Sequence, residues 1–214
     1  MGAFKFIDVN QNSDEWFALR GGKLTSSNLG KIMANFGKSF GEPAKKYAYN
    51  IANEQITGEP ISSDYSNAHM ERGHEQEPIA RMIYEEQTFC DVTNGGFFES
   101  DFIGCSPDGL VGDSGAIEIK SVISNVHYLN VKRQKVDPAY KWQCVGNLKF
   151  TSRDWLDFIS YCSTYPEGKQ IFIHRIRKED LTEEFRMIDE RVAEFKSLVD
   201  ECKKTILESK YDNY

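Results

Sequence analysis

Long apolar runs are missing from this chain: its uninterrupted stretches of apolar residues span only a few positions. A membrane-spanning helix needs about 18 or more such residues, so we expect no transmembrane segment and no membrane partner. Near the N-terminus, Lys5 and Asp8 interrupt the stretch that a signal peptide would keep continuously apolar. We therefore expect a cytoplasmic protein.

Cysteine and proline are both sparse. The five cysteines are odd in number and no two are closer than 15 residues, which excludes a CxxC pair, a zinc ribbon and the clustered spacing of an iron–sulfur site. We expect reduced and mostly buried thiols. The six prolines are scattered, and neither a repeat nor a Pro/Ser-rich linker divides the sequence. A single domain spanning residues 1–214 is predicted.

The chain also lacks an excess of positive charge. Its net charge of −7 argues weakly against nucleic acid as a partner, because non-specific DNA affinity comes from Lys and Arg on phosphates. The charge is unevenly distributed along the chain. Between residues 118 and 153 there are seven positive and two negative side chains, so this segment carries a local +5 while the rest carries −12. The overlap of this basic segment with the polar residues described below favours a DNA-binding track, although a solvated helix face would have the same composition.

The sequence has 214 residues, 40% hydrophobic and 28% charged, the balance of a soluble domain with its own core. Apolar periodicity and turn residues indicate helices and short strands in the order α, then β, then mixed. We predict an α/β fold in which helices flank a central mixed sheet and a long helix ends the chain. The predicted helices cover 14–20, 28–34, 43–57, 66–87, 138–150 and 180–209, and the predicted strands 95–99, 102–105, 110–111, 115–121, 155–161 and 170–176.

Polar groups stand in segment 106–120 where a sheet would favour apolar ones. Asp108 lies in a Pro-Asp-Gly turn at the end of one strand. Glu118 and Lys120 are two residues apart on the next strand and therefore share a face, opposite to the face of the neighbouring isoleucines. Two carboxylates and an ammonium group are thus predicted to converge at one edge of the sheet.

Such an oxygen-rich site is typical of Mg²⁺ or Mn²⁺, the ions that phosphodiester chemistry uses. Phosphodiester hydrolysis must neutralise the anion, generate a nucleophile and stabilise the leaving alkoxide, and metal ions on carboxylates serve all three needs. A lysine beside them can orient or deprotonate the attacking water, with burial and the carboxylates acting on its pKa in opposite directions. Taken alone, the pattern leaves simpler interpretations open: an exposed E-x-K is usually a surface ion pair, and Asp108 fits a plain turn.

Five short patterns occur in order between residues 14 and 160. The first, W-x-x-L-R-x-G-x-[IL]-T-x-S, is matched by Trp16, Leu19, Arg20, Gly22, Leu24, Thr25 and Ser27. The others, G-x-x-x-E, S-P-D-G-L, apolar-E-apolar-K and A-Y-x-x-Q, are matched by Gly73 with Glu77, by 106–110, by 117–120, and by Ala139, Tyr140 and Gln143. Together they resemble the PD-(D/E)xK nuclease superfamily, and more closely the phage lambda exonuclease family of YqaJ-type viral recombinases.

The resemblance implies a restriction-endonuclease-like core over about residues 14–176, and roles for individual residues. As metal ligands it implies Asp108, Glu118 and the backbone carbonyl of Ile119, with Glu77 as an optional further ligand. It also implies that Lys120 activates water, with Glu77 and Gln143 as supporting catalytic groups. Arg20, Ser27 and Ser106 correspond to a pocket for a 5′-phosphate, in keeping with the affinity of an arginine fork and hydroxyl groups for phosphate.

Members of this family are 5′ to 3′ exonucleases on double-stranded DNA, form ring-shaped homotrimers and work with a single-strand annealing protein. The resemblance therefore implies a Mg²⁺-dependent enzyme, with Mn²⁺ as an alternative ion, that degrades linear duplex DNA from 5′-phosphorylated ends. The products would be 5′-mononucleotides and 3′ single-stranded overhangs for recombination. It also implies a phage-encoded or prophage protein in a bacterial host.

Two other functions remain open at this point. A structure- or site-specific endonuclease of the same superfamily would cut closed circles, but it would have no use for a terminal-phosphate pocket. A non-catalytic DNA-end-binding protein with a decayed site would need no complete Asp, Glu and Lys set. The DNA-end-binding protein would not be an enzyme, since it would bind DNA without cleaving it.

Overall fold

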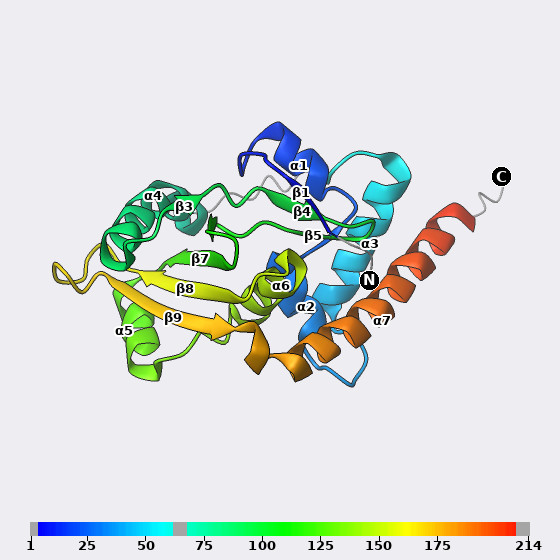
Figure 1. The fold of residues 1–214 in the computed structure, drawn as a ribbon. Helices are drawn as coiled ribbons and strands as arrows, with labels where there is room; N and C mark the ends of the chain where they lie inside the picture. Colours follow the sequence, from blue (N-terminus) through cyan, green and yellow to red (C-terminus); the bar gives the residue numbers. More distant parts are fainter. Residues whose placement is uncertain (1–3, 62–67, 209–214) are drawn as a thin grey trace.

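The structure is a computed structural model that describes residues 4–61 and 68–208, with side chains for all of these except 68–72 and 74. Its helices and strands are labelled in Figure 1. The helices are α1 (Asp14–Arg20), η1 (Ser26–Asn28), α2 (Leu29–Met33), α3 (Glu42–Thr57), α4 (Ala68–Thr88), α5 (Ser124–Arg133), α6 (Lys141–Thr151), η2 (Lys178–Asp180) and α7 (Thr182–Glu208). The strands are β1 (Lys5–Ile7), β2 (Leu24–Thr25), β3 (Val92–Thr93), β4 (Phe97–Glu99), β5 (Ile103–Cys105), β6 (Gly109–Val111), β7 (Gly115–Ser121), β8 (Trp155–Tyr161) and β9 (Ile171–Arg177).

The predicted α/β class and the long final helix are confirmed, but the described strands form two sheets rather than one. The smaller sheet has the order β1-β4-β5-β2 and the larger one the order β3-β6-β7-β8-β9. Both are mixed, since β2 runs parallel to β5 and β7 runs parallel to β8, while the other pairs are antiparallel. The last of the chain's passages between the two sheets lies between β5 and β6, at Pro107, which has no N–H to donate to a strand ladder.

The larger sheet separates two layers of helices. Side chains of β7 alternate between its faces: Ile117 and Ile119 pack with Ala80 and Tyr84 of α4. On the other face, residues of β7 and β8 such as Ala116 and Phe158 pack against α6. The two faces of β7 are therefore covered by the two helices that carry the remaining predicted site residues, Glu77 on α4 and Gln143 on α6.

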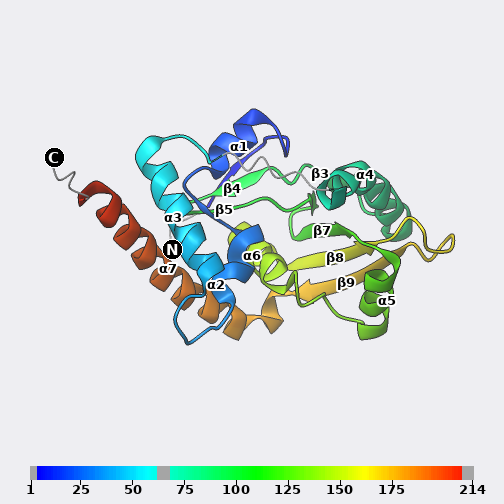
Figure 2. The same cartoon turned by 180° about the vertical axis from the view of Figure 1, so that it is seen from behind.

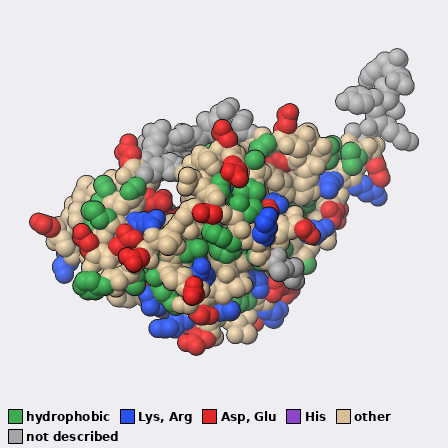
Figure 3. Space-filling view, turned by 45° about the horizontal axis from the view of Figure 1, so that its top comes forward, with side chains coloured by type: hydrophobic (Ala, Val, Ile, Leu, Met, Phe, Trp, Pro, Cys, Tyr) green, Lys and Arg blue, Asp and Glu red, His purple; other side chains and the backbone are tan. Residues whose placement is uncertain are grey.

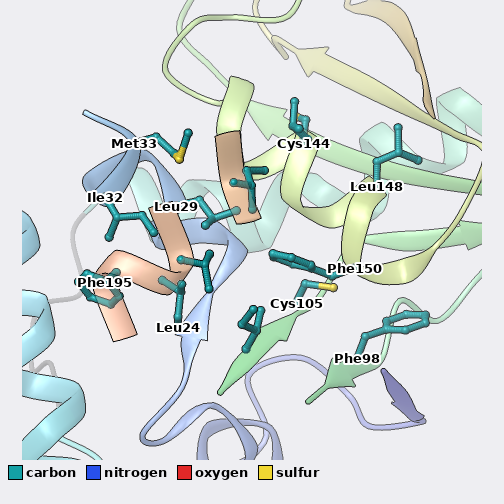
Figure 4. Close-up of a cluster of buried hydrophobic side chains, with 14 of the residues drawn as sticks. Leu24, Leu29, Ile32, Met33, Phe98, Cys105, Cys144, Leu148, Phe150 and Phe195 are labelled. Atoms are coloured by element: carbon teal, nitrogen blue, oxygen red, sulfur yellow. The ribbon is translucent and has the colours of Figure 1, made fainter. Parts of the chain in front are cut away.

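The largest core cluster joins elements from both halves of the sequence. Figure 4 shows side chains of β2, α2, β4, β5, α6 and α7 converging on one another, among them Leu24, Leu29, Cys105, Leu148 and Phe195. In both ribbon views α7 lies alongside α3, at the opposite end of the molecule from α4 and α5 (Figures 1 and 2). Helix α7 closes this core with buried residues Ile188, Val192, Phe195 and Val199.

Several predicted boundaries agree closely with the structure, and others differ. Strands 115–121 and 155–161 have the predicted bounds, and the described part of the final helix is Thr182–Glu208. The helix predicted over 28–34 is α2 (Leu29–Met33), preceded by η1, and neither Thr25 before η1 nor Asn28 before α2 makes a side-chain cap hydrogen bond. The hydroxyl groups of this segment bond elsewhere, as described below. Helix α5 and strands β1, β2 and β3 were not predicted.

All five cysteines are free thiols, and three of them are buried: Cys105, Cys144 and Cys162. Within the described ranges, the helices contain no stretch that is both long and apolar enough to cross a membrane.

Candidate active site

Glu118 is the centre of a hydrogen-bond network on β7. Its side chain is fully buried, and both of its carboxylate oxygens accept hydrogen bonds. Gln143 Nε2 donates to Oε1 at 2.5 Å and Asn147 Nδ2 donates to Oε2 at 2.7 Å, while Lys120 Nζ forms an ion pair with Oε1. The prediction that Glu118 and Lys120 share a face of the strand is confirmed, and this face is turned toward α6.

Asp108 lies on the adjoining chain segment, directly before β6. Its Oδ2 accepts a hydrogen bond from the amide of Ile119 at 2.6 Å, and its own amide donates to the carbonyl of Ile117 at 3.1 Å. These two bonds fix the Asp108 carboxylate beside the strand that carries Glu118. The residue therefore has both features foreseen for it, a turn position and a carboxylate directed at the E-x-K strand.

The carboxyl groups of this site repel one another. Burial, followed by the charge of Asp108, raises the pKa of Glu118 to about 8. The same two causes raise the pKa of Glu77 on α4 to about 7. Burial lowers the pKa of Lys120, but the nearby Glu118 and Asp108 carboxylates outweigh it and raise that pKa overall. Lys120 is thus a fixed positive charge within a strongly anionic site.

The donor atoms fit a hard divalent cation. Asp108, Glu118 and the Ile119 carbonyl supply only oxygen, which Mg²⁺ and Mn²⁺ prefer. Burial and the charge of Asp108 raise the pKa values of Glu118 and Glu77, and a cation bound between these groups would offset both effects. In the part of the chain that the structure describes, no group of three or more His, Cys, Asp or Glu side chains is arranged to hold a metal ion. Without Glu77, the predicted ligand set contains only two such side chains and a backbone oxygen. The optional ligand Glu77 therefore does not form a group of three with Asp108 and Glu118 in the described structure.

The three residues predicted to bind a 5′-phosphate gather around one indole ring. The Arg20 guanidinium stacks 4.0 Å from the centroid of the Trp16 ring and donates to Ser27 Oγ at 3.3 Å. Trp16 Nε1 donates to Ser106 Oγ at 3.0 Å, and Ser106 in turn donates to the carbonyl of Gly96 at 2.6 Å. Trp16 therefore joins the N-terminal motif to the segment that carries Asp108. Burial lowers the pKa of Arg20, which remains a cation at any physiological pH.

A second connection joins the two groups of residues through Ser26 and Asn147. Ser26 Oγ donates to Asn147 Oδ1 at 2.5 Å, and the same amide donates to Glu118. Sequence reasoning missed Asn147, Ser26 and the bridging role of Trp16. The spacing of Asn147 was a usable signal, because it follows Gln143 by four residues and so lies on the same face of a helix.

The basic segment 118–153 is partly neutralised by the rest of the fold. Lys141 Nζ lies 3.0 Å from Glu184, and Lys149 Nζ lies 2.9 Å from Asp189, so two of its cations pair with α7. On the face drawn in Figure 3, acidic and basic side chains are interspersed. Lys132 and Lys135 are exposed. The local excess of +5 therefore does not form one uninterrupted cationic track.

Comparisons with known proteins agree with these motifs. Residues 15–154 match the YqaJ-like viral recombinase domain. An alkaline exonuclease from Laribacter hongkongensis, LHK-Exo, has 32% sequence identity and a TM-score of 0.75, over 92% of this chain and 99% of its own. Its complex with dAMP gives 33% identity and a TM-score of 0.77 over the same shares of the two chains.

A phage-related exonuclease from Haemophilus somnus 129PT has 16% identity and a TM-score of 0.66, with 86% of this chain and 96% of that chain covered, which is a likeness of fold. No curated protein matched the sequence. The match to the recombinase domain covers more than half of the chain, and it contains Arg20, Asp108, Glu118 and Lys120. The chain belongs to the YqaJ-like viral recombinase family.

Proposed function

We propose that this protein is a metal-dependent 5′ to 3′ exonuclease that degrades linear double-stranded DNA from 5′-phosphorylated ends. The observation that carries the proposal is the Glu118–Lys120 ion pair on β7, with the Asp108 carboxylate held beside it by the amide of Ile119. Family membership and the likeness to LHK-Exo, an alkaline exonuclease whose complex with dAMP is known, support a nuclease role. The proposed enzyme is one domain over residues 1–214 with its core at 14–176.

In this proposal Asp108, Glu118 and the Ile119 carbonyl hold Mg²⁺, or Mn²⁺ in its place, with Glu77 as an optional further ligand. When bound, such an ion neutralises phosphate charge and lowers the pKa of water. Gln143 holds the Glu118 carboxylate in place through its 2.5 Å hydrogen bond. Lys120 orients the attacking water with its ammonium protons, because the neighbouring carboxylates keep it charged.

The second half of the site would select the DNA end. Arg20 supplies a charged fork for the terminal phosphate, with Ser27 and Ser106 as hydroxyl partners. Because Ser106 already donates its only proton to Gly96, it contributes to the pocket mainly by holding Trp16 under Arg20. In-line attack of water on the terminal phosphodiester would release a 5′-mononucleotide and lengthen the 3′ overhang.

The experiment that tests the proposal uses linear duplex DNA labelled separately at each end, with either 5′-phosphate or 5′-hydroxyl termini. The protein is incubated with it in Mg²⁺ or in EDTA, next to a covalently closed circle. We expect Mg²⁺-dependent release of mononucleotides from phosphorylated 5′ ends, and intact circles. Cut circles would replace the proposal with an endonuclease, and binding without cleavage would replace it with a DNA-end-binding protein.

The partners belong to the proposal as well. A homotrimeric ring around the duplex would keep the enzyme on its substrate by topology, which suits a chain with a net charge of −7. The 3′ overhangs would pass to a single-strand annealing protein for recombination, in the cytoplasm of a bacterium that carries the phage or prophage gene. The recombinase description of the matched domain supports this context.

A further inference from the structure

The amide of Asn147 joins two buried groups that belong to different parts of the site. Asn147 is 1% exposed and lies on α6, four residues after Gln143. Its Nδ2 donates to Glu118 Oε2 at 2.7 Å, and its Oδ1 accepts from Ser26 Oγ at 2.5 Å. Ser26 is also 1% exposed and directly precedes Ser27, which accepts a hydrogen bond from Arg20.

These contacts determine which way the amide points. An Asn side chain has a donor end and an acceptor end, and a flip would direct its carbonyl oxygen at a carboxylate. The Glu118 carboxylate prevents this, because it only accepts hydrogen bonds, and the Ser26 hydroxyl then donates to the carbonyl oxygen on the other side of the amide. The donor end is therefore held against Glu118 Oε2, while Oε1 receives Lys120 and Gln143.

The close approach of α6 to η1 is built into the backbone. Gly146, next to Asn147, is buried, and a Cβ at this position would overlap Leu29 Cδ1 and lie 3.2 Å from Ser26 Cβ. A residue with a side chain would move η1 away and stretch the Ser26 to Asn147 hydrogen bond. The sequence thus provides the space that the contact needs.

We propose that Asn147 is a positioning residue for the metal site: anchored by Ser26, it fixes the Glu118 carboxylate in the rotamer that leaves Oε1 toward Lys120 and Gln143. This inference rests on the proposed function, since it assigns Glu118 the role of a metal ligand. It adds a supporting residue on α6 and connects the 5′-end segment to the catalytic edge through one buried amide. Partners that orient metal ligands typically change metal affinity by 10- to 100-fold when they are removed.

The test measures Mn²⁺ binding to the DNA-free protein by electron paramagnetic resonance. Asn147→Ala should weaken Mn²⁺ binding by about tenfold or more. Ser26→Ala, which removes one hydroxyl and is the milder change, should weaken it by about fivefold, the effect of one lost hydrogen bond. In exonuclease assays both variants should lower kcat and leave KM for DNA unchanged, because no group that contacts the DNA end is altered.

Asn130→Ala is the matched control. Asn130 is likewise a fully buried asparagine that donates to a serine, Ser160, but it lies on α5. Ser160 pairs with Lys120 in the sheet, yet the hydrogen bond from Asn130 goes to a serine hydroxyl and not to a predicted metal ligand. Its replacement should lower the melting temperature and leave Mn²⁺ affinity at the wild-type value. Equal losses of Mn²⁺ affinity in Asn130→Ala and Asn147→Ala would show a general effect of stability and overturn the inference.

Asp108→Asn separates this inference from the proposed function. If the wild type binds Mn²⁺ and Asp108→Asn does not, the proposed metal site is supported. In that case, unchanged Mn²⁺ binding by both Asn147→Ala and Ser26→Ala overturns only the role of Asn147. If the wild type binds no Mn²⁺ at all, the metal site and the role of Asn147 fall together.

Discussion

The buried Glu118 carboxylate accepts hydrogen bonds from three side chains. A carboxylate on the surface can bond to water instead, whereas a buried charge must be paired within the protein. Its three donors come from β7 and α6, so two elements must be in place before the carboxylate is satisfied. The three donors differ in what they provide. Lys120 supplies a positive charge, whereas the amides of Gln143 and Asn147 fix the orientation of the Glu118 carboxylate.

At the scale of single residues, Asp108→Asn and Lys120→Ala should each lower the rate of cleavage by at least about 10²-fold, because each change removes several kcal/mol of transition-state stabilisation. DNA binding should persist in both. The Asn variant keeps an oxygen that can accept the Ile119 amide, so its loss of activity is not a loss of fold. The matched control is Asp113→Asn, an exposed residue in the turn between β6 and β7. Wild-type cleavage by either site variant would remove that residue from the mechanism.

Arg20→Ala should remove most of the preference for 5′-phosphate over 5′-hydroxyl ends. The guanidinium is the only cation among the three predicted pocket residues, and its fork is what selects a phosphate. The measured quantity is the ratio of degradation rates on the two kinds of end. Lys38→Ala, which deletes an exposed positive charge elsewhere, controls for a general loss of electrostatic attraction. A ratio that stays at the wild-type value would rule out the pocket.

The raised carboxyl pKa values predict how stability depends on pH. Glu118 and Glu77 titrate near 8 and 7 in the folded chain and near the ordinary 4.5 when unfolded. The folded protein therefore binds more protons within this window, and its stability falls as the pH rises from about 4.5 to about 8. Metal binding needs the deprotonated forms, so stabilisation by Mg²⁺ should grow over the same range. Melting temperatures in EDTA and in Mg²⁺ test this, and an EDTA curve that is flat with pH would contradict it.

At the scale of elements, α6 is the helix that assembles the site. It packs against η1, α2 and β8, and it carries Gln143 and Asn147 on the face turned toward Glu118. Its close contact with η1 depends on Gly146. Helix α4 contributes from the opposite face of the sheet, where the Tyr84 hydroxyl donates to Asp157 at 2.8 Å and fixes the helix that carries Glu77.

Gly146→Ala should destabilise the fold by about 1–3 kcal/mol, the usual cost of overpacking a filled core. Leu29, whose Cδ1 the new methyl group would meet, is fully buried, so its displacement would disturb the main core. Denaturant unfolding measures the change. Gly30→Ala is the control, because it lies on α2 with nothing within 4 Å of the added Cβ. Equal stability of the two variants would show that α6 and η1 can separate without cost.

The sequence predicted those elements whose periodicity or turn residues are strong. Strand β7 and Asp108 were predicted because a Pro-Asp-Gly turn and an apolar-E-apolar-K alternation are local signals. Helix α5 was missed because its exposed Tyr128 and Leu129 obscure the amphipathic pattern. The two-residue strands β2 and β3 exist only through pairing with distant partners. The roles of Trp16 and Ser26 likewise depend on contacts between segments some 90 and 120 residues apart, which no local pattern encodes.

At the scale of the whole molecule, we expect three copies to associate in solution. Light scattering coupled to size exclusion should give about three times the chain mass of 24.5 kDa. A ring of this kind encloses the duplex, so one binding event should remove many nucleotides even when a trap of unlabelled DNA is added. A monomer mass at concentrations where degradation is processive would contradict the ring.

Helix α7 closes the main core and holds α6 through Lys141 to Glu184 and Lys149 to Asp189. Proteins are synthesised from the N-terminus at about 5–20 residues per second, so this helix is the last described element to leave the ribosome. Until it does, Leu24 and Ile32 have no cover from Phe195, and α6 has no partner for its lysines. The edge that carries Glu118 and Lys120 would therefore gain its full support only after α7 has emerged, so its assembly waits for the last described helix.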